Sequence, residues 1–510
     1  MDPVSERAIS EALDVAQKHL GWSSGDLELP DLIAHEDISF NWASYKGKLA
    51  RSIMDGDCSP SQVEVVDLPK DRLTVRPLAR LDVEHRLVYD AAVFAAANAI
   101  QSATPRSVYS YRWWTRRQRL LSPSGMWLKM QRAGKLIHEK NPQLLAIRTD
   151  ISAYYEHIDI ELLLDDLAAL DIPKWSLQTL RSFLHAFNGL SHAWGIPQGS
   201  DASGLLANLY LVPLDALLAR LGYRHLRYSD DVYIFGESWI SLREVLLNAN
   251  RLLRYRHLNI AGSKTKIISG TDIKDHFEDR EKDAISYGVY TGAEWAPGEL
   301  RKFFDRISFG RTDQDDPISP RDLRFSLTQL RRLGDPYAVE WLLENLGEIP
   351  HVAREALIYL SGFHNRSLSK AVVDLLVDSK TTIYPYAEQH LLIYMIRNGV
   401  RNKRAISVAW DLLLNKNKDS FVREFAARYL GLNAPAGEAS ALRQEFQGET
   451  NKRVRRAMLL ACYEARQCPD PWLTVISKSD PAIRMTADYL RNHPAEIPFP
   501  TVERRYNDDR

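Results

Sequence analysis

The sequence predicts an α+β domain followed by an all-α region of helical repeats. Short apolar runs, typical of strands, end at Asp150 and flank the pair Asp230-Asp231. Past Gly298 these strand signals disappear, and the chain becomes a succession of amphipathic helical patterns. We therefore divide the 510 residues into four parts: an N-terminal helical extension (1–70), a mixed domain (71–300), a linker (301–317) and α-helical repeats (318–510).

The composition limits the class of protein. With 66 basic and 66 acidic residues the net charge is zero, so only local clusters of charge can indicate a polyanionic partner. No apolar stretch reaches the ~18 residues of a membrane span. The first residues lack the basic segment and apolar core of a secretory signal. The three cysteines, Cys58, Cys462 and Cys468, match neither a metal spacing nor a disulfide framework. We expect a cytoplasmic protein that does not engage a membrane.

Two arginines mark the start of the mixed domain. Arg76 and Arg80 lie in the segment Leu73–Arg80, and a helix with an Ala-rich apolar face is predicted from Asp82 to Ile100. Arginine binds phosphate oxygens through paired hydrogen bonds. A role in surface salt bridges is the alternative for both side chains.

Residues 101–148 form a basic and aromatic segment. It contains ten Lys or Arg residues against the single acid Glu139, interleaved with Tyr and Trp. Basic groups neutralise phosphates, and aromatic faces stack on unpaired bases. We predict contact with nucleic acid, although a solvated charged face would have the same composition. The candidate residues are Arg112, Trp113, Arg116, Arg117 and Arg119.

Three aspartates follow predicted strands. Asp150 ends an apolar run that starts at Leu144, and Asp230 and Asp231 lie at the tip of a β-hairpin between Leu226 and Gly236. Between these sites the chain reads Gly-Ile-Pro-Gln-Gly-Ser from 195 to 200 and enters an apolar helix. Adjacent carboxylates repel each other, so such a tip is either solvated or occupied by a cation.

The order of these motifs resembles the palm of bacterial reverse transcriptases, which ends in a Tyr-x-Asp-Asp hairpin. The resemblance implies a right-hand polymerase with palm and fingers that adds dNTPs to DNA under the direction of RNA. Asp150, Asp230 and Asp231, with the carbonyl of Ile151, would hold two Mg²⁺ ions, or Mn²⁺ in their place. Two such ions stabilise the attacking and leaving oxygens of an in-line displacement, and Mg²⁺ prefers a few carboxylates plus substrate phosphates.

The same resemblance assigns nucleotide-binding roles. Tyr155 would form the wall under the sugar that favours deoxynucleotides, with a core aromatic as the alternative. Gln198 and Gly199 would approach the incoming nucleotide. Lys264 would approach the departing pyrophosphate, or be a solvated loop lysine. Arg76 and Arg80, in the fingers, would hold the triphosphate, and Ile285 to Gly288 weakly resembles the hairpin that grips the primer.

The chain departs from the family at Asp201 and Gly204, which stand where bacterial enzymes commonly have Pro. These residues add a charge and flexibility near the expected primer-template path. After Gly288 only about one helix is predicted before the repeats, so a conventional thumb is not expected. A palm and fingers joined directly to helical repeats resembles the abortive-infection and defence-associated reverse transcriptases. That resemblance implies a role in antiphage defence.

A loose repeat runs through the helical half. Apolar residues lead similar segments at Val352, Tyr386, Val422, Val454 and Ile483, with steps of 34, 36, 32 and 29 residues. The period resembles HEAT-like repeats, although an irregular helical domain is the alternative. The last segment, Ile483 to Asn492, lacks a clear polar cap, and we therefore expect a homo-oligomer.

Three functions remain open at this stage. The leading one is a reverse transcriptase whose partners are dNTPs, an RNA template or non-coding RNA, and the DNA product. The second is a template-independent DNA polymerase of the same fold, including one primed by a protein hydroxyl. The third is an inactive RNA-binding scaffold, against which the intact Asp150, Asp230 and Asp231 argue.

Overall fold

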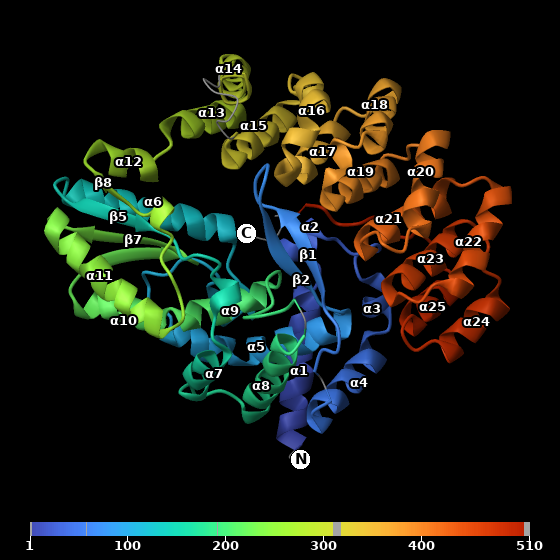
Figure 1. The fold of residues 1–510 in the computed structure, drawn as a ribbon, viewed down its shortest axis with the longest axis horizontal. Coiled ribbons are helices and arrows are strands. Elements are labelled where there is room, and N and C mark those ends of the chain that lie inside the picture. Colours follow the sequence, from blue (N-terminus) through green and yellow to red (C-terminus); the bar gives the residue numbers. More distant parts are fainter. Residues whose placement is uncertain (1–2, 58, 191, 310–317, 504–510) are drawn as a thin grey trace.

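A computed structural model describes residues 3–57, 59–190, 192–309 and 318–503. Cys58 and residues 310–317 of the predicted linker lie outside this description. Figure 1 shows the palm sheet on one side, the helical region on the other, and strands β1 and β2 between them.

The centre of the mixed domain is a four-stranded antiparallel sheet with the order β6-β7-β5-β8. The strands are β5 (Leu145–Thr149), β6 (Arg224–Tyr228), β7 (Asp231–Gly236) and β8 (Lys266–Ser269). The predicted strand and hairpin are confirmed, since β6 and β7 pair through a tight turn at 229–230. Both faces of this sheet are covered, which explains the nearly continuous apolar runs.

Alternating side chains of the strands enter two different cores. Ile147, Val232 and Ile234 face one side and pack on three helices, α9 (Asp201–Tyr210), α10 (Val212–Arg220) and α11 (Trp239–Tyr255). Ala146, Tyr233 and Phe235 face the other side and pack on α6 (Pro123–Lys140) and α12 (Thr271–Phe277). The sheet is therefore the middle layer of three.

The fingers and the N-terminal extension surround a buried helix. The predicted Ala-rich helix is α5 (Val83–Ala103), which packs on α1 (Pro3–His19), α8 (Lys174–Asn188) and α9. Other elements of this part are α2 (Ser24–Glu28), α3 (Glu36–Phe40), α4 (Trp42–Asp55), β3 (Trp113–Trp114), β4 (Arg119–Leu120) and α7 (Ile160–Ala168). The extension is not purely helical, because β1 (Glu64–Pro69) pairs antiparallel with β2 (Val75–Arg80).

The second half consists of helix pairs. Consecutive inner helices stack on one another: α15 (Pro320–Leu333), α17 (Ala353–Ser361), α19 (Pro385–Arg397), α21 (Ser420–Asn433), α23 (Lys452–Glu464) and α25 (Arg484–Arg491). The helices α16 (Val339–Asn345), α18 (Arg366–Val377), α20 (Lys403–Leu414), α22 (Ala436–Gly448) and α24 (Asp470–Ser479) alternate with them along the chain. Each of the five leading repeat residues lies within three residues of the start of an inner helix, from α17 to α25.

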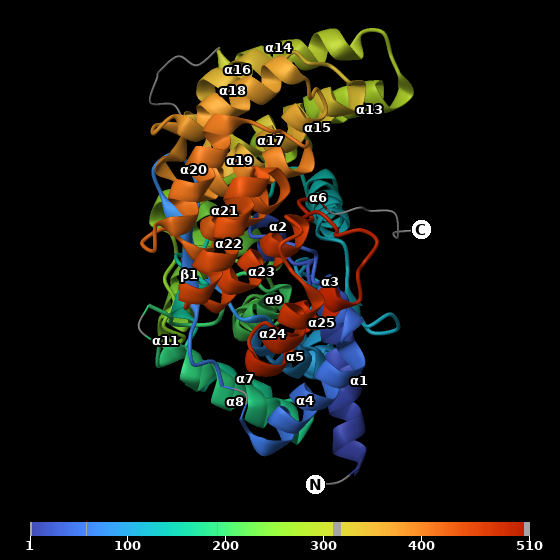
Figure 2. The ribbon, with the colours of Figure 1, turned by 90° about the vertical axis from the view of Figure 1, so that its right-hand side faces the viewer.

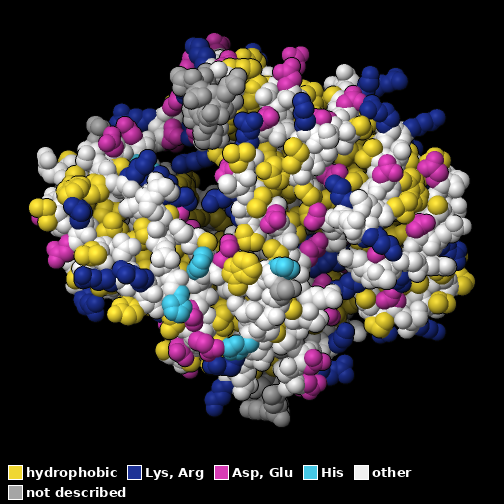
Figure 3. Space-filling view, viewed as in Figure 1, with side chains coloured by type: hydrophobic (Ala, Val, Ile, Leu, Met, Phe, Trp, Pro, Cys, Tyr) yellow, Lys and Arg dark blue, Asp and Glu magenta, His cyan; other side chains and the backbone are white. Residues whose placement is uncertain are grey.

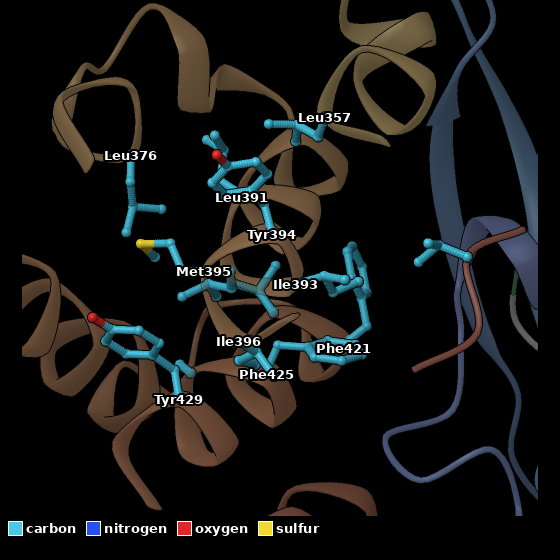
Figure 4. Packing of buried hydrophobic residues seen from close by; sticks show 14 of the residues in the cluster. Leu357, Leu376, Leu391, Ile393, Tyr394, Met395, Ile396, Phe421, Phe425 and Tyr429 are labelled. Carbon is cyan, nitrogen blue, oxygen red and sulfur yellow. The ribbon is translucent and has the colours of Figure 1, made fainter. Parts of the chain in front are cut away.

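The inner helices are buried on most of their circumference. Every residue of α19 from Tyr386 to Ile396 is buried, and Figure 4 shows its side chains Leu391, Tyr394 and Met395 directed to different neighbours. A helix that is buried all round lies inside the molecule rather than at its surface, and here the buried set includes the polar Glu388, Gln389 and His390.

The predicted boundary at 301–317 is wrong in part, because α14 (Ala296–Ser308) occupies residues 301–308. The predicted primer-grip hairpin is also wrong, since Ile285 to Gly288 belong to the helix α13 (Arg280–Thr291). Ile285, Leu300 and Phe304 share one core with the repeats. Figure 2 shows α13, α14 and α15 together at one end of the molecule. The helical region therefore begins at α13.

The repeats also share their core with the N-terminal extension and the fingers. Leu32, Val66 and Leu78 belong to the same hydrophobic cluster as the inner helices. The last repeat is not an open end, because α3 packs on α25. Asn41 donates a hydrogen bond to the carbonyl of Met485, and Ile483 is 1% exposed. The reason given above for expecting a homo-oligomer is thus wrong.

One stretch of the described chain, Asp201–Arg220 across α9 and α10, is long and apolar enough to span a membrane by length and composition. The expectation that no stretch would reach this length is therefore wrong. Within this stretch, 72% of the most apolar 18-residue segment is buried inside the protein. Length and composition are weak evidence for a span, because a core helix has the same two properties.

Candidate active site

The three aspartates meet at one edge of the palm sheet. Thr149 pairs with Val232, and Tyr228 pairs with Asp231, so the end of β5 lies beside the tip of the β6-β7 hairpin. Burial, together with the neighbouring charges of Asp150 and Asp231, raises the pKa of Asp230 to about 7. Burial and Asp150 also raise the pKa of Asp231. The site concentrates negative charge that a cation would relieve.

Lys264 is the ammonium nearest to this cluster. Its Nζ lies 2.5 Å from Oδ2 of Asp150. Burial lowers the pKa of Lys264, but the hydrogen bond to Asp150 and the charges of the three aspartates together outweigh burial, and the net pKa is raised. The backbone brings the lysine there, because the amide of Ala261 donates to the carbonyl of Asp150 at 2.8 Å and Ile151 bridges to Ile260. Lys264 is therefore a direct neighbour of the acids, while its predicted contact with pyrophosphate stays a prediction.

A second positive group lies on the other side. The guanidinium of Arg148 lies 4.0 Å from Asp231, and its charge lowers the pKa of that carboxyl against the effects of burial and Asp150. The sequence analysis counted Arg148 only as part of the basic segment. Its position two residues before Asp150 on β5 is the signal that was missed, since residues two apart on a strand share a face.

The oxygen donors suit a hard divalent cation, which prefers carboxylates and carbonyls. In residues 3–503, apart from the undescribed ones, no three His, Cys, Asp or Glu side chains converge as the ligands of one ion would. Lys264 is bound to Asp150 instead. The close carboxylates and the raised pKa values of Asp230 and Asp231 fit a cation site in which the ammonium of Lys264 takes the place of the cation.

The Gly195–Ser200 loop packs closely on the site. A Cβ on Gly195 would lie 2.1 Å from the carbonyl oxygen of Tyr155, and its φ is +68°. Only glycine is accommodated there. The amide of Ala79 on β2 donates to the carbonyl of Gln198 at 2.8 Å, and the amide of Gly25 donates to that of Gly199 at 3.2 Å. The fingers and the N-terminal extension thus fix the backbone of Gln198 and Gly199.

The two departures from the family pattern have structural explanations. Gly204 is buried in α9, where a Cβ would lie 2.3 Å from the ring of Tyr111. Asp201 accepts a hydrogen bond from the amide of Ser24 at 3.3 Å. The expectation of flexibility at Gly204 is therefore wrong, because this glycine makes room for an aromatic ring.

Tyr155 lies beside the catalytic hairpin. It packs edge-on against Tyr154 at 5.7 Å between ring centroids. Burial raises its pKa, and its hydroxyl interacts with Tyr111 and Ser229. Tyr154 is 4% exposed and donates to the carbonyl of Ala207, so it is the core aromatic of the pair. This arrangement leaves Tyr155 as the candidate wall under the sugar.

We predict that Tyr155→Ala admits ribonucleotides, because the ring that would collide with a 2′-hydroxyl is removed. The ratio of kcat/KM for dNTP over rNTP is expected to fall about tenfold or more. Steady-state competition between dATP and ATP measures this ratio. Tyr154→Phe, which keeps a ring in the neighbouring core position, is the control. Unchanged discrimination in Tyr155→Ala would place the gate elsewhere.

The structure contradicts three of the predicted binding residues. The guanidinium of Arg80 is held by Glu424 at 2.7 Å and Glu64 at 3.1 Å, so it is part of the junction with α21 and not a triphosphate ligand. Arg112 donates to the carbonyls of Thr104 and Pro105. Trp113 is 5% exposed, so its face is not available to bases.

The remaining basic residues are placed at the surface or near it. Arg76, Arg116 and Arg117 are exposed. Arg117 and Arg119 lie over the ring of Trp114 at 4.8 and 5.4 Å. Trp114, which is less buried than Trp113, is therefore the better aromatic candidate. Figure 3 shows a hollow between the palm side and the centre of the molecule, with Lys and Arg side chains at its rim.

Comparison with known families agrees with this geometry. Residues 75–294 match the family described as reverse transcriptase (RNA-dependent DNA polymerase). No curated protein matches the chain. The matched residues extend from β2 to the segment after α13 and include all three aspartates. Residues 75–294 therefore form a reverse transcriptase domain with the palm and fingers of a polymerase, and this domain indicates a nucleotidyltransferase of the RNA-directed DNA polymerase class.

Proposed function

We propose that this reverse transcriptase adds dNTPs to a DNA end by a two-metal mechanism centred on Asp150, Asp230 and Asp231. The observation that carries the proposal is that the strand ends bearing these three aspartates are neighbours at one edge of the palm sheet, where burial and the charges of Asp150 and Asp231 raise the pKa of Asp230. Two Mg²⁺ ions, with Mn²⁺ as a substitute, would supply stabilisation of the attacking and leaving oxygens. The carbonyl of Ile151 would complete the ligand set.

Lys264 has a proposed role that follows from its ion pair. Because a divalent cation and the Lys264 ammonium compete for Asp150, metal binding would free Nζ. The freed ammonium would then lie close enough to bind the negatively charged pyrophosphate. Arg76, exposed on β2, and the backbone of Gln198 and Gly199 would bind the rest of the nucleotide.

We expect purified protein with Mg²⁺, an RNA template and an annealed DNA primer to extend the primer with dNTPs matched to the template. Removal of Mg²⁺ with a chelator should stop extension, and Mn²⁺ should restore it. Gel analysis with each dNTP supplied singly tests whether the template dictates the product. A protein that incorporates no nucleotide under any of these conditions would support the inactive scaffold instead.

Template-independent synthesis is the second candidate, and one observation favours it. The N-terminal extension contacts the Gly-rich loop directly, since the amide of Gly25 donates to Gly199 and the amide of Ser24 to Asp201. A Cβ on Gly25 would lie 2.7 Å from the Gly199 oxygen, so no space remains between them. If this loop lies along the template path, α2 restricts that path. Equal incorporation with and without RNA would identify this activity, which includes priming from a protein hydroxyl.

We further propose a role in antiphage defence for a cytoplasmic enzyme with HEAT-like repeats. The support is the direct connection of α13 and α14 to the stacked helix pairs, with no separate domain between them in residues 192–309. Plaque counts on cells that express either the wild type or Asp230→Asn would test the role. Non-coding RNA as a partner and a homo-oligomeric state both stay predictions.

A further inference from the structure

The turn that carries the catalytic aspartates contains a residue in the left-handed region. Ser229 has a φ of +57°, between Tyr228 at the end of β6 and Asp230. For a residue with a Cβ this conformation carries a steric cost, so it persists only where neighbouring groups hold it. The backbone at Ser229 sets the direction in which Asp230 and Asp231 leave the turn.

Both backbone polar groups of Ser229 are held by side chains. Its amide donates to Oγ of Ser110 at 2.7 Å. Its carbonyl accepts from the guanidinium of Arg227 at 3.1 Å. Ser110 lies in a loop far from the hairpin in sequence, so the turn is gripped from two sides.

Behind these contacts is a closed network of buried polar groups. Arg227 is 0% exposed and donates to both carboxylate oxygens of Asp215, at 3.0 and 2.6 Å. It also donates to the side-chain oxygen of Asn208 at 3.1 Å and to its carbonyl at 3.2 Å. Asn208 in turn accepts from Oγ of Ser110 and donates to the Ser110 carbonyl. Every member is paired with another member or with the turn.

Such a network is a poor way to gain stability alone, because burying an Arg–Asp pair costs about as much as it returns. A fixed geometry is what a fully paired polar network provides. The loop is fastened to β6 as well, since the amide of Arg227 donates to the carbonyl of Ser107 and the amide of Tyr109 donates to that of Arg227. The network and the loop therefore move together with the turn.

We propose that Ser110, Asn208, Asp215 and Arg227 are positioning residues that hold Ser229 left-handed and so set the placement of the metal-binding carboxylates. The proposal rests on the proposed metal role of Asp230 and Asp231. It assigns a function to the loop at 107–111 that differs from contact with nucleic acid. In this role the four residues act through the backbone of the turn and not by direct contact with substrate or metal.

Ser110→Ala tests the proposal, because it removes the acceptor of the Ser229 amide without adding volume. We expect kcat to fall about ten- to a hundredfold, the effect of a misplaced reacting group, and the Mg²⁺ concentration for half-maximal rate to rise several-fold. The KM for dNTP should change by less than about twofold, because the variant leaves the proposed nucleotide-binding residues unchanged. Ser176→Ala is the matched control, since Ser176 on α8 is also buried and its hydroxyl donates a 2.7 Å hydrogen bond to the carbonyl of Ala92 on α5.

Ser229→Gly supplies the decisive rescue, because glycine adopts the left-handed region without a steric cost. The double variant Ser110→Ala/Ser229→Gly should recover most of the kcat that Ser110→Ala loses. Its dependence on Mg²⁺ should match that of the single variant Ser229→Gly. A general loss of stability would not be rescued in this way, and melting temperatures of Ser110→Ala and Ser176→Ala should agree.

The outcomes separate the two proposals. If Asp230→Asn is inactive but Ser110→Ala keeps the wild-type kcat and Mg²⁺ dependence, the positioning role is overturned and the metal role is left intact. An active Asp230→Asn would overturn the metal role itself. A loss in Ser110→Ala that Ser229→Gly does not restore would also overturn the positioning role.

Discussion

Asp230→Asn and Asp231→Asn are each expected to reduce nucleotide incorporation below a few per cent of wild type while the protein stays folded. Each change removes one carboxylate charge from the site and keeps the size of the side chain. An amide oxygen is a weaker ligand for a hard dication than a carboxylate. Primer extension at saturating Mg²⁺ and dNTP measures the loss, and circular dichroism checks the fold.

The same substitution should affect stability in a pH-dependent way. In the metal-free protein the pKa of Asp230 is raised from 3.8 to about 7, so the folded state binds this proton more tightly than the unfolded state. Stability is therefore lost as the pH rises from about 4 to 7. Asn carries no such penalty, so Asp230→Asn should be more stable than wild type by about 1–2 kcal/mol at pH 8, with little difference at pH 4.

Thermal unfolding in chelator at the two pH values tests this sign. Asp171→Asn, an exposed aspartate of the same domain, is the control for loss of a charge alone. Polymerisation by Asp230→Asn above a few per cent of wild type would show that the two-metal assignment is wrong. A stability difference that shrinks with rising pH would contradict the electrostatic account of the site.

The acidic site could be predicted because its signals are local. The hairpin around Asp230 and Asp231 joins residues a few positions apart, and each flanking run is buried on both faces. The strand before Asp150, β5, is likewise buried on both faces. Short-range pairing and continuous apolar runs are the features that a sequence displays directly.

The failed predictions depend on distant partners. Arg80 is held by Glu424, 344 positions along the chain, and no local pattern indicates this pairing. Trp113 and Trp114 form the whole of β3, and Trp113 is the buried ring because it stacks on Phe94 and His19, which are distant in the sequence. The boundary at 301 failed because α13 and α14 are amphipathic helices that pack on the repeats, which composition cannot distinguish from a connecting segment.

Arg80→Ala should strongly destabilise the protein, because it leaves the buried carboxylate of Glu424 without its cation and takes one cation from the partly buried Glu64. Arg80 binds Glu424 through two hydrogen bonds of 2.7 and 2.9 Å and Glu64 through one of 3.1 Å. The side chains of Arg80 and Glu424 are 12% and 4% exposed. Breaking a buried pair by removing one partner costs about 3–5 kcal/mol. The midpoint of thermal unfolding measures the effect.

Arg72→Ala is the matched control, since it also removes an arginine that joins the fingers to the helical region. Arg72 pairs with Glu348, and both side chains are about half-exposed, at 54% and 53%. An exposed pair of this kind contributes about 0–1 kcal/mol. We therefore expect a much smaller shift in the melting temperature than for Arg80→Ala.

The contrast also tests which role Arg80 has. If Arg80 binds the triphosphate, Arg80→Ala should raise the KM for dNTP and leave the melting temperature unchanged. That result would restore the role first predicted from the sequence. The structural role instead predicts a lowered melting temperature. It also predicts lower activity, because Arg80 is on β2 and the amide of Ala79 on the same strand donates to the carbonyl of Gln198 in the Gly195–Ser200 loop. Loss of the Arg80 ion pairs would loosen that strand, so the helical region supports catalysis by holding the fingers in place.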